Sequence, residues 1–325
     1  MENLNKEVVL SIVIPTLNRR ELLEKTLDLL IKQLSDALIT IEVIVCDNAS
    51  NDNTETLFND DGRFANIVKY VRYNDRVNID DSFARSIALC AGKYVNLFGD
   101  DDLPLPGFIK ELTYTISTNK NVDLFYINRV VGDENLFNTS FIPHSNSPFG
   151  IRLMSISKFV NEFTHWPGFV TCLVFSANAW ERSFGEKTYF DGYNFLSRIY
   201  IGCKDKIACF IASPLVLQRR GIQSWKKFWP QYWLVSMPQL LENLEINNVT
   251  SGALTTWRQK EVTTKRYLID RFVAKAYAYP ITSLFWKESR KYQVSGIRQI
   301  GSLFIQYLVP VFIAKFLYSK TNKMT

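Results

Sequence analysis

The chain has 325 residues, of which 47% are hydrophobic and 22% charged, and its net charge is +6. This length suits one large domain or two ordinary ones with a real core, and the composition excludes a disordered, collagen-like or coiled-coil protein. Residues 1–218 carry 21 Lys and Arg against 27 Asp and Glu, a net charge of −6, whereas residues 219–325 carry 17 against 5, a net charge of +12. The asymmetry predicts different partners for the two parts, and the basic part suits an anionic membrane or nucleic acid.

Cysteine and histidine usage narrows the chemistry further. The five cysteines have no close spacing, which predicts buried, reduced thiols. With only two histidines, His144 and His165, a histidine-rich metal centre is excluded, so any metal would be held by carboxylates, which favours Mg²⁺ or Mn²⁺. The N-terminus shows no basic region followed by an apolar one, so we expect no signal peptide and a cytoplasmic active domain.

The first third of the chain alternates strand and helix patterns. Strands are predicted for 8–14, 41–45, 67–73 and 93–98, with helices from Leu23 to Leu34 and from Asn78 to Ile87. This alternation predicts an α/β fold with a doubly wound, Rossmann-like, mostly parallel sheet. Ligands of such sheets bind beyond the carboxyl ends of the strands, where we expect residues 15–18, 47–50 and 100–102.

The rest of the chain changes character near Gly221. Before it, the pattern predicts a long loop, a strand, a helix and a second strand, at 128–150, 169–175, 191–201 and 207–217. After it, basic and aromatic residues recur in helical patterns over 225–245 and 254–278, and 300–314 has no charged residue. We therefore expect a nucleotide-binding, catalytic domain at 1–221 and a helical, basic region at 222–325.

Three consecutive aspartates, Asp100, Asp101 and Asp102, follow the fourth predicted strand. Like charges this close repel one another unless a cation is present. Mg²⁺ and Mn²⁺ are commonly held by one or two carboxylates together with substrate phosphates. A divalent cation bridging this cluster to a diphosphate is therefore the favoured interpretation, against the alternative of solvated surface acids. In either case we expect exposed loop acids that contribute little to the core.

The motifs Ser11-Ile-Val-Ile-Pro-Thr-Leu-Asn-Arg19, Asp47-Asn-Ala-Ser50 and Gly99-Asp-Asp-Asp102 together resemble family 2 glycosyltransferases of the GT-A fold, over roughly residues 8–220. The Gly-Asp-Asp-Asp form and the length are similar to bacterial O-antigen or capsule transferases, including the abequosyltransferase-like branch. The resemblance implies transfer of a sugar from a nucleotide donor, with inversion at the anomeric carbon and with Mn²⁺ or Mg²⁺ as cofactor.

The resemblance also implies a donor site. Its expected members border the base, ribose and phosphates, with Asp47 on the nucleobase and a basic residue on the diphosphate: Pro15, Thr16, Asn18, Arg19, Asp47, Asn48, Ser50, Arg85, Asp100 and Arg219. Each has a plainer alternative, such as a strand terminator for Pro15 and an exposed helix charge for Arg85. Asn48 and Ser50 could also cap the helix that follows them.

The metal ligands, the base and the acceptor contacts follow from the same resemblance. Family members that read Asp-Ser-Asp-Asp align their first acid with Gly99 and leave Asp101 as the metal ligand, whereas an Asp-x-Asp pattern pairs Asp100 with Asp102; the metal is expected on Asp101 or Asp102. Asp191 matches the general base, although Phe190 replaces the usual Glu before it. His165 and Trp166 are expected to border the acceptor, since an indole face suits a sugar.

The expected function is therefore that of a metal-dependent, inverting hexosyl- or deoxyhexosyltransferase. Its acceptor is expected to be a lipid-linked glycan, and its role to be in the synthesis of envelope polysaccharides. The alternatives are a non-catalytic nucleotide-sugar or glycan-binding protein on a transferase fold, or a nucleic-acid binder, for which no recognition motif is present. The uncharged tract 300–314 is short for a membrane span, so we expect peripheral, monotopic attachment to the inner face of the cell membrane, against the alternative of a helix packed on the protein itself or in a homo-oligomer.

Overall fold

The computed structural model describes residues 7–132, 140–141, 150–163, 169–183, 192–219 and 231–260, together with positions 305, 309–311 and 313–314. The chain divides into two compact units, each described by itself below. The first comprises Met1–Phe159, Gly168–Lys187 and Arg198–Ile222, and the second comprises Val160–Pro167, Thr188–Ser197 and Gln223–Thr325.

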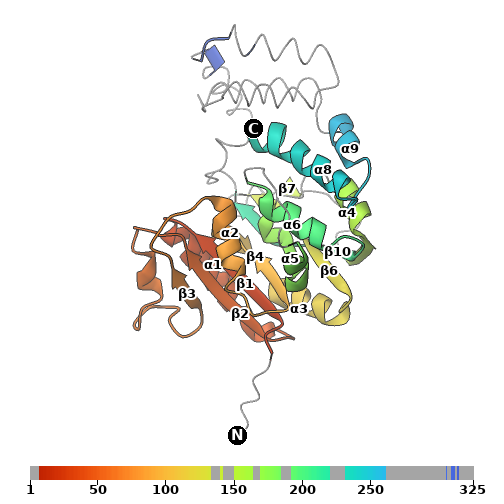
Figure 1. Ribbon diagram of the computed structural model, residues 1–325. Helices are drawn as coiled ribbons and strands as arrows, with labels where there is room; N and C mark the ends of the chain where they lie inside the picture. Colours follow the sequence, from red (N-terminus) through yellow and green to blue (C-terminus); the bar gives the residue numbers. More distant parts are fainter. Residues whose placement is uncertain are drawn as a thin grey trace. The chain divides into compact units, whose positions relative to one another are not determined.

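One mixed sheet forms the core of the first unit (Figure 1). Within the described residues its main order is β3-β2-β1-β4-β9-β6-β10-β5, with β7 beside β6 and β8 beside β10. The longest pairings, β1 with β2 and β6 with β10, are parallel. The strands are β1 (Leu10–Thr16), β2 (Ile41–Asp47), β3 (Lys69–Arg72), β4 (Tyr94–Leu97), β5 (Asp102–Pro104), β6 (Val122–Gly132), β7 (Ser140–Phe141), β8 (Ile151–Ser155), β9 (Leu173–Ser176) and β10 (Ile207–Arg219).

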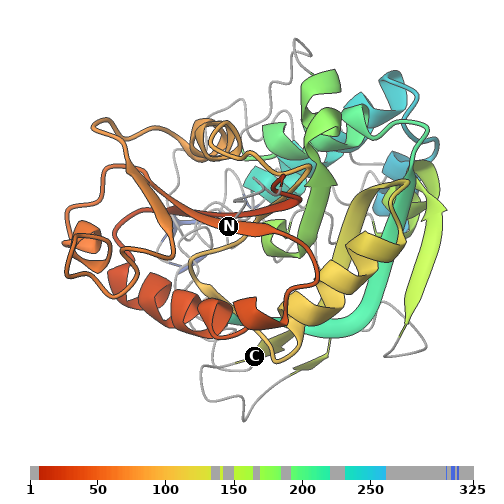
Figure 2. The ribbon, with the colours of Figure 1, turned by 90° about the horizontal axis from the view of Figure 1, so that it is seen from below.

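The central strands are apolar on both faces because helices cover both sides of the sheet. In β1, Ile12, Val13 and Ile14 are all fully buried. Seen along its layers in Figure 2, the sheet has α1 (Arg20–Ile31) and α3 (Phe108–Thr118) on one side and α2 (Ile79–Ile87) on the other. The predicted α/β fold with a mostly parallel sheet is confirmed.

A side-chain cap fixes where α2 begins. Asn78 accepts a hydrogen bond from the backbone N–H of Asp81 and so caps α2, where the sequence placed the start of this helix.

The first unit also contains α5 (Ala177–Arg182) and three 3₁₀ turns, Leu34–Asp36, Thr54–Leu57 and Val170–Cys172. Residues of both units contribute to α4 (Ile156–Glu162) and α6 (Asn194–Gly202).

The structure corrects the sequence in two places. Residues 128–132, predicted as the start of a long loop, are the end of β6 and pair with β10. The prediction was wrong because polar residues such as Asn128 and Arg129 are usually exposed in loops, whereas both are buried here. The strand predicted for 169–175 begins only at Leu173, after a 3₁₀ turn. That turn positions Thr171, which matters for the site described below.

In the second unit, the described helical residues comprise a π-helical segment (Tyr232–Ser236), α8 (Met237–Ile246) and α9 (Ala253–Lys260). They agree with the helical patterns predicted there, whereas 225–230 and 261–278 lie outside the described residues. Trp233 and Trp257, both buried, pack with their ring centroids 5.9 Å apart. No helix in the described part of the chain has the length and hydropathy needed to cross a bilayer.

Candidate functional site

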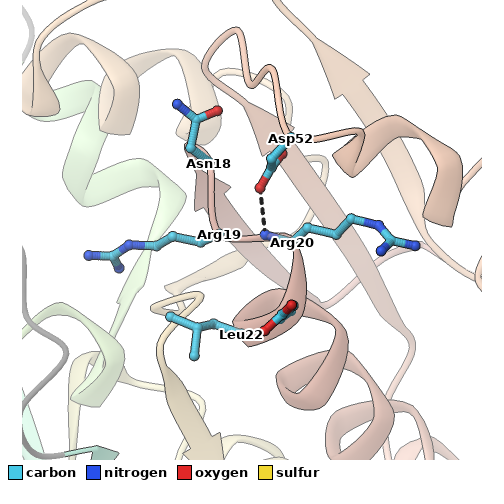
Figure 3. A pocket seen from close by; sticks show the side chains of 6 residues that line it. Asn18, Arg19, Arg20, Leu22 and Asp52 are labelled. Atoms are coloured by element: carbon cyan, nitrogen blue, oxygen red, sulfur yellow. Dashed lines mark hydrogen bonds between the residues drawn. The ribbon is translucent and has the colours of Figure 1, made fainter.

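Three loops of the first unit leave the same edge of the sheet, at the carboxyl ends of β1, β2 and β4. Parallel pairing places Thr16 beside Asp47 at this edge, and the N–H of Phe98 donates to Val13. The convergence predicted from the sequence is therefore confirmed. A cleft of about 330 Å³ opens there at the start of α1, lined by Asn18, Arg19, Arg20, Glu21, Leu22 and Asp52 (Figure 3).

The first two loops are tied together around this cleft. The backbone N–H of Asn18 donates to Ser50 Oγ (2.9 Å), and Asn18 Oδ1 accepts from the N–H of Asn51 (2.8 Å). Asn18 has a positive φ of 53°, a conformation that asparagine tolerates better than most residues. Asp52 accepts from the N–H of Arg20 (2.9 Å), the bond drawn in Figure 3. The start of α1 is thereby held in one position.

Asp100 lies inside this edge and is not exposed as the sequence suggested. Its residue is 5% exposed, and both carboxylate oxygens are engaged: Oδ2 accepts from Thr16 Oγ1 (2.8 Å) and Oδ1 from Arg19 Nη1 (2.7 Å). The pKa of Asp100 is raised to about 6, because burial raises it by more than the neighbouring Arg19 lowers it. Asp100 thus links the β1 loop to the loop after β4.

Asp102 is also buried, at 5% exposure, so the expectation of exposed loop acids is wrong for two of the three. Its Oδ2 accepts a hydrogen bond from Thr171 Oγ1, which in turn accepts from the backbone N–H of Gly99 (3.0 Å). Burial and the charge of Asp101 raise the pKa of Asp102 well above its usual value. Thr171 was not singled out from the sequence, because nothing in its own neighbourhood signals a partner 69 residues away.

Asp101 is the more open acid of the three. Its side chain is 17% exposed against 7% for Asp100, and Oδ2 lies 2.9 Å from Arg19 Nη1. Arg19, at the residue before α1, therefore bridges two carboxylates with one nitrogen. In Figure 3 the side chains of Arg19 and Arg20 extend in opposite directions from the start of the helix.

The oxygens near Gly99 fit a hard divalent cation. A Cβ placed on Gly99 would lie 2.8 Å from Asp102 Oδ2, 3.0 Å from Thr171 Oγ1 and 3.2 Å from Asp101 Oδ1, so side-chain oxygens converge above this glycine. Oxygen donors of this kind suit Mg²⁺ or Mn²⁺. Among the described residues no three His, Cys, Asp or Glu side chains are grouped so that they could hold a metal ion by themselves.

Two buried arginines lie near the acid loop on β10, which pairs with Asp102 through Gln218, and on the next strand, β6. Arg219, at the end of β10, donates to the backbone carbonyls of Asp101, Asp100 and Leu22, and its expected contact with the diphosphate stays a prediction. Arg129 of β6, missed in the sequence because it was assigned to a loop, donates to Gln218 (3.0 Å) and to Tyr126 (2.7 Å). Both arginines act electrostatically on Asp102, whose pKa they lower against the effect of burial.

The loop after β2 is organised around Asp47, which is fully buried. Its Oδ1 accepts from the N–H of Ser50 (2.7 Å) and its Oδ2 from the hydroxyl of Tyr70 (2.6 Å). The ring of Tyr70 stacks on Phe58 at 4.4 Å between centroids. Each carboxylate oxygen of Asp47 therefore already accepts one hydrogen bond from within the protein.

Neither Asn48 nor Ser50 caps a helix as proposed from the sequence, because their side chains have other partners. Asn48 forms two hydrogen bonds with the backbone of Val77, 29 residues on, and the loop leads into a 3₁₀ turn that starts after Asn53. Arg85 lies on α2 as predicted, half-buried, with its guanidinium 4.7 Å from the ring centroid of Tyr73 and bonded to the carbonyl of Asp75. Pro15 is the penultimate residue of β1.

Three predicted site residues, Asp191, His165 and Trp166, lie outside the described residues. Their roles as base and acceptor contacts stay predictions.

Comparison of the sequence with known families gives a match to "Glycosyl transferase family 2" over residues 11–178, about half of the chain. The chain is also 35% identical over 96 residues to abequosyltransferase RfbV of Salmonella typhimurium, a match that spans 29% of this chain and 28% of that relative. The matched stretch is therefore less than a third of the relative's length.

Comparison of the fold finds TarS of S. aureus. Its 1–349 fragment superposes with a TM-score of 0.52 at 12% identity, over 98% of this chain and 92% of that one. The same fragment in complex with UDP-GlcNAc gives a TM-score of 0.51 at 11% identity, over 92% of this chain and 79% of that one. At such identities the likeness is one of fold.

Proposed function

The chain belongs to glycosyl transferase family 2, and from that premise we propose that it is a metal-dependent, inverting hexosyl- or deoxyhexosyltransferase that uses a nucleotide-sugar donor. The acceptor is a glycan, lipid-linked in the synthesis of a bacterial O-antigen, capsule or other envelope polysaccharide. The observation that carries the proposal is the loop after β4, where two of the three aspartates, Asp100 and Asp101, pair with Arg19 beside a cleft at the carboxyl edge of the sheet.

The donor is assigned to this edge because its groups match a nucleoside diphosphate. Asp47 and the Tyr70 hydroxyl offer acceptor lone pairs to the N–H groups of a base, and Arg19 and Arg85 offer charged donors to phosphate oxygens. TarS, which shares the fold, has been solved with UDP and with UDP-GlcNAc, and this supports a nucleotide donor here.

Asp101 and Asp102 would hold the cation, which, when bound, neutralises charge on the departing diphosphate. The acceptor hydroxyl oxygen attacks the anomeric carbon from the face opposite the diphosphate, so that a new C–O bond forms as the bond to the phosphate oxygen breaks. Asp191 takes the hydroxyl proton, a task that suits a carboxylate whose pKa lies near the working pH. Inversion follows from the single displacement.

The basic region 222–325 is proposed to hold the enzyme at the cytoplasmic membrane surface, where a lipid-linked acceptor would be found. The partial similarity to an abequosyltransferase supports an envelope glycan as the product. The attachment is proposed as peripheral and monotopic.

A donor screen tests the proposed function. The protein is incubated with Mn²⁺ and a panel of UDP-, CDP-, GDP- and dTDP-sugars, and the released nucleoside diphosphate is measured. We expect one nucleotide to be released, with slow turnover to water in the absence of acceptor. Tight binding of a nucleotide sugar with neither hydrolysis nor transfer to any glycan would favour the non-catalytic alternative.

Substitution of the proposed base separates binding from chemistry. Asp191→Asn is nearly isosteric and removes only basicity, so donor affinity should be unchanged while transfer falls by about 10²–10⁴-fold. Native-rate transfer by this variant between about pH 6 and pH 9 would assign the base to another residue.

A further inference from the structure

The charge of the acid loop is already balanced by side chains of the chain itself. Arg19 forms ion pairs with Asp100 and Asp101, at 2.7 and 2.9 Å. Asp102 lies within the electrostatic influence of Arg129 and Arg219. Two of the three carboxylates thus pair directly with Arg19, and the third lies in the field of two guanidinium groups that are almost wholly buried. A divalent cation would enter a site that is close to neutral.

The three arginines differ in how tightly they are fixed. Arg219 is 1% exposed and donates to backbone carbonyls of three residues, and Arg129 is fully buried between Tyr126, Gln218 and the ring of Phe169. Arg19 has a side chain 20% exposed and lines the cleft shown in Figure 3. Of these three arginines, Arg19 is the one that is exposed to solvent to any appreciable extent.

The two acids that Arg19 bridges also differ. Asp100 is buried, and its other oxygen accepts a hydrogen bond from Thr16. Asp101 is half-open, with Oδ2 toward Arg19 and Oδ1 on the side of Gly99 and Asp102. A cation held by Asp101 and Asp102 would therefore stand near the Arg19 guanidinium, and two positive charges this close repel each other strongly at the edge of a protein.

We infer that Arg19 is a built-in counter-cation of the acid loop, which competes with a divalent cation for Asp101 and is drawn away by the donor diphosphate. The inference deepens the proposed function and rests on it for the identity of the ligands. A guanidinium released from a carboxylate finds an equivalent partner in phosphate oxygens. The cation and the diphosphate therefore bind with positive coupling, since each favours the Arg19 position that the other needs.

The test measures Mn²⁺ affinity of the nucleotide-free protein by electron paramagnetic resonance of free Mn²⁺, with no activity assay. Arg19→Gln removes the competing charge, so we expect at least about tenfold tighter Mn²⁺ binding than in the wild type. Arg19→Lys keeps a charge but not the planar fork, so its affinity should lie between the two. Arg63→Gln is the matched control: Arg63 pairs with Glu24 and Asp28 of α1, away from the acid loop, and its loss should change nothing.

A second measurement keeps the inference testable should Arg19→Gln fold poorly. In wild-type protein labelled with ¹⁵N-arginine, Mg²⁺ addition should shift the Arg19 Nε–H resonance, assigned by its absence in Arg19→Lys. Equal or weaker Mn²⁺ binding by Arg19→Gln, no Mn²⁺ binding by either protein, or an unmoved Arg19 resonance at saturating Mg²⁺ would overturn the inference. Tighter Mn²⁺ binding without sugar transfer would instead reject the proposed function alone, and transfer with unchanged affinity would reject the inference alone.

Discussion

At the scale of single residues, the acid loop depends on groups outside its own motif. A Cβ at Gly99 would lie 2.8 Å from Asp102 Oδ2 and 3.0 Å from Thr171 Oγ1, so a larger residue there would force these oxygens to shift. One of the two motif readings given above aligns the first acid of the Asp-Ser-Asp-Asp pattern with this glycine and leaves Asp101 as the expected metal ligand. The side chain of Asp101 is the more exposed, at 17% against 7% for Asp100.

Thr171→Val tests whether the 3₁₀ turn before β9 supports the acid loop. The swap is close in volume and removes a hydroxyl that bonds both Asp102 and the Gly99 N–H. Leaving buried polar groups unpaired costs about 1–3 kcal/mol, so the free energy of unfolding in urea should fall by that amount. Thr171→Ser, which keeps the hydroxyl, should stay near the wild type; equal stability of all three proteins would contradict the assignment.

Asp101→Ala and Asp102→Ala should both lower kcat by at least about 10²-fold, equivalent to about 2.7 kcal/mol of transition-state stabilisation. Their stabilities should differ, because Asp102 is buried against Thr171 and Asp101 is more open. We expect thermal unfolding to show a lower midpoint for Asp102→Ala than for Asp101→Ala. Near-normal turnover of both variants would remove the metal assignment from this loop.

At the scale of elements, the end of β10 joins α1 to the loop after β4 through Arg219. Its guanidinium reaches the carbonyl of Leu22 on α1 and those of Asp100 and Asp101. A lysine cannot replace this planar fork. Arg219→Lys should therefore lower the free energy of unfolding by about 1–3 kcal/mol. In the exposed Arg63→Lys control the change should be within about 0.5 kcal/mol, and an equally small change in Arg219→Lys would argue against the joining role.

The elements also show how far the sequence alone could lead. The strands β1, β2 and β4 were predicted because apolar, β-branched runs end in polar loops, and those loops identified most of the candidate donor edge. The end of β6 was missed, because Asn128 and Arg129 look like loop residues until Tyr126, Gln218 and Phe169 are brought around them. The roles of Thr171 and Arg219 depend on contacts across 69 and 118 residues, which local patterns cannot report.

At the scale of the whole molecule, the uneven distribution of charge along the chain predicts that the basic C-terminal region binds a membrane surface. The region from 219 to 325, with a net charge of +12, should bind anionic lipid through electrostatic attraction of about 1 kcal/mol for each Lys or Arg near the surface. In flotation assays we expect the full-length protein to rise with vesicles that contain phosphatidylglycerol and to stay behind with pure phosphatidylcholine. Binding should weaken at high salt, and full-length protein that remains with the soluble fraction at low salt would contradict peripheral attachment.

The central claim is that the carboxyl edge of this sheet binds a nucleoside diphosphate together with a divalent cation. Isothermal titration of the full-length protein with UDP, CDP, GDP and dTDP, each with and without Mn²⁺, tests it most directly. The account predicts that at least one nucleotide binds, that Mn²⁺ strengthens this binding, and that Asp101→Asn abolishes the strengthening while leaving the fold intact. Failure of all four nucleotides to bind in the presence of Mn²⁺ would contradict it.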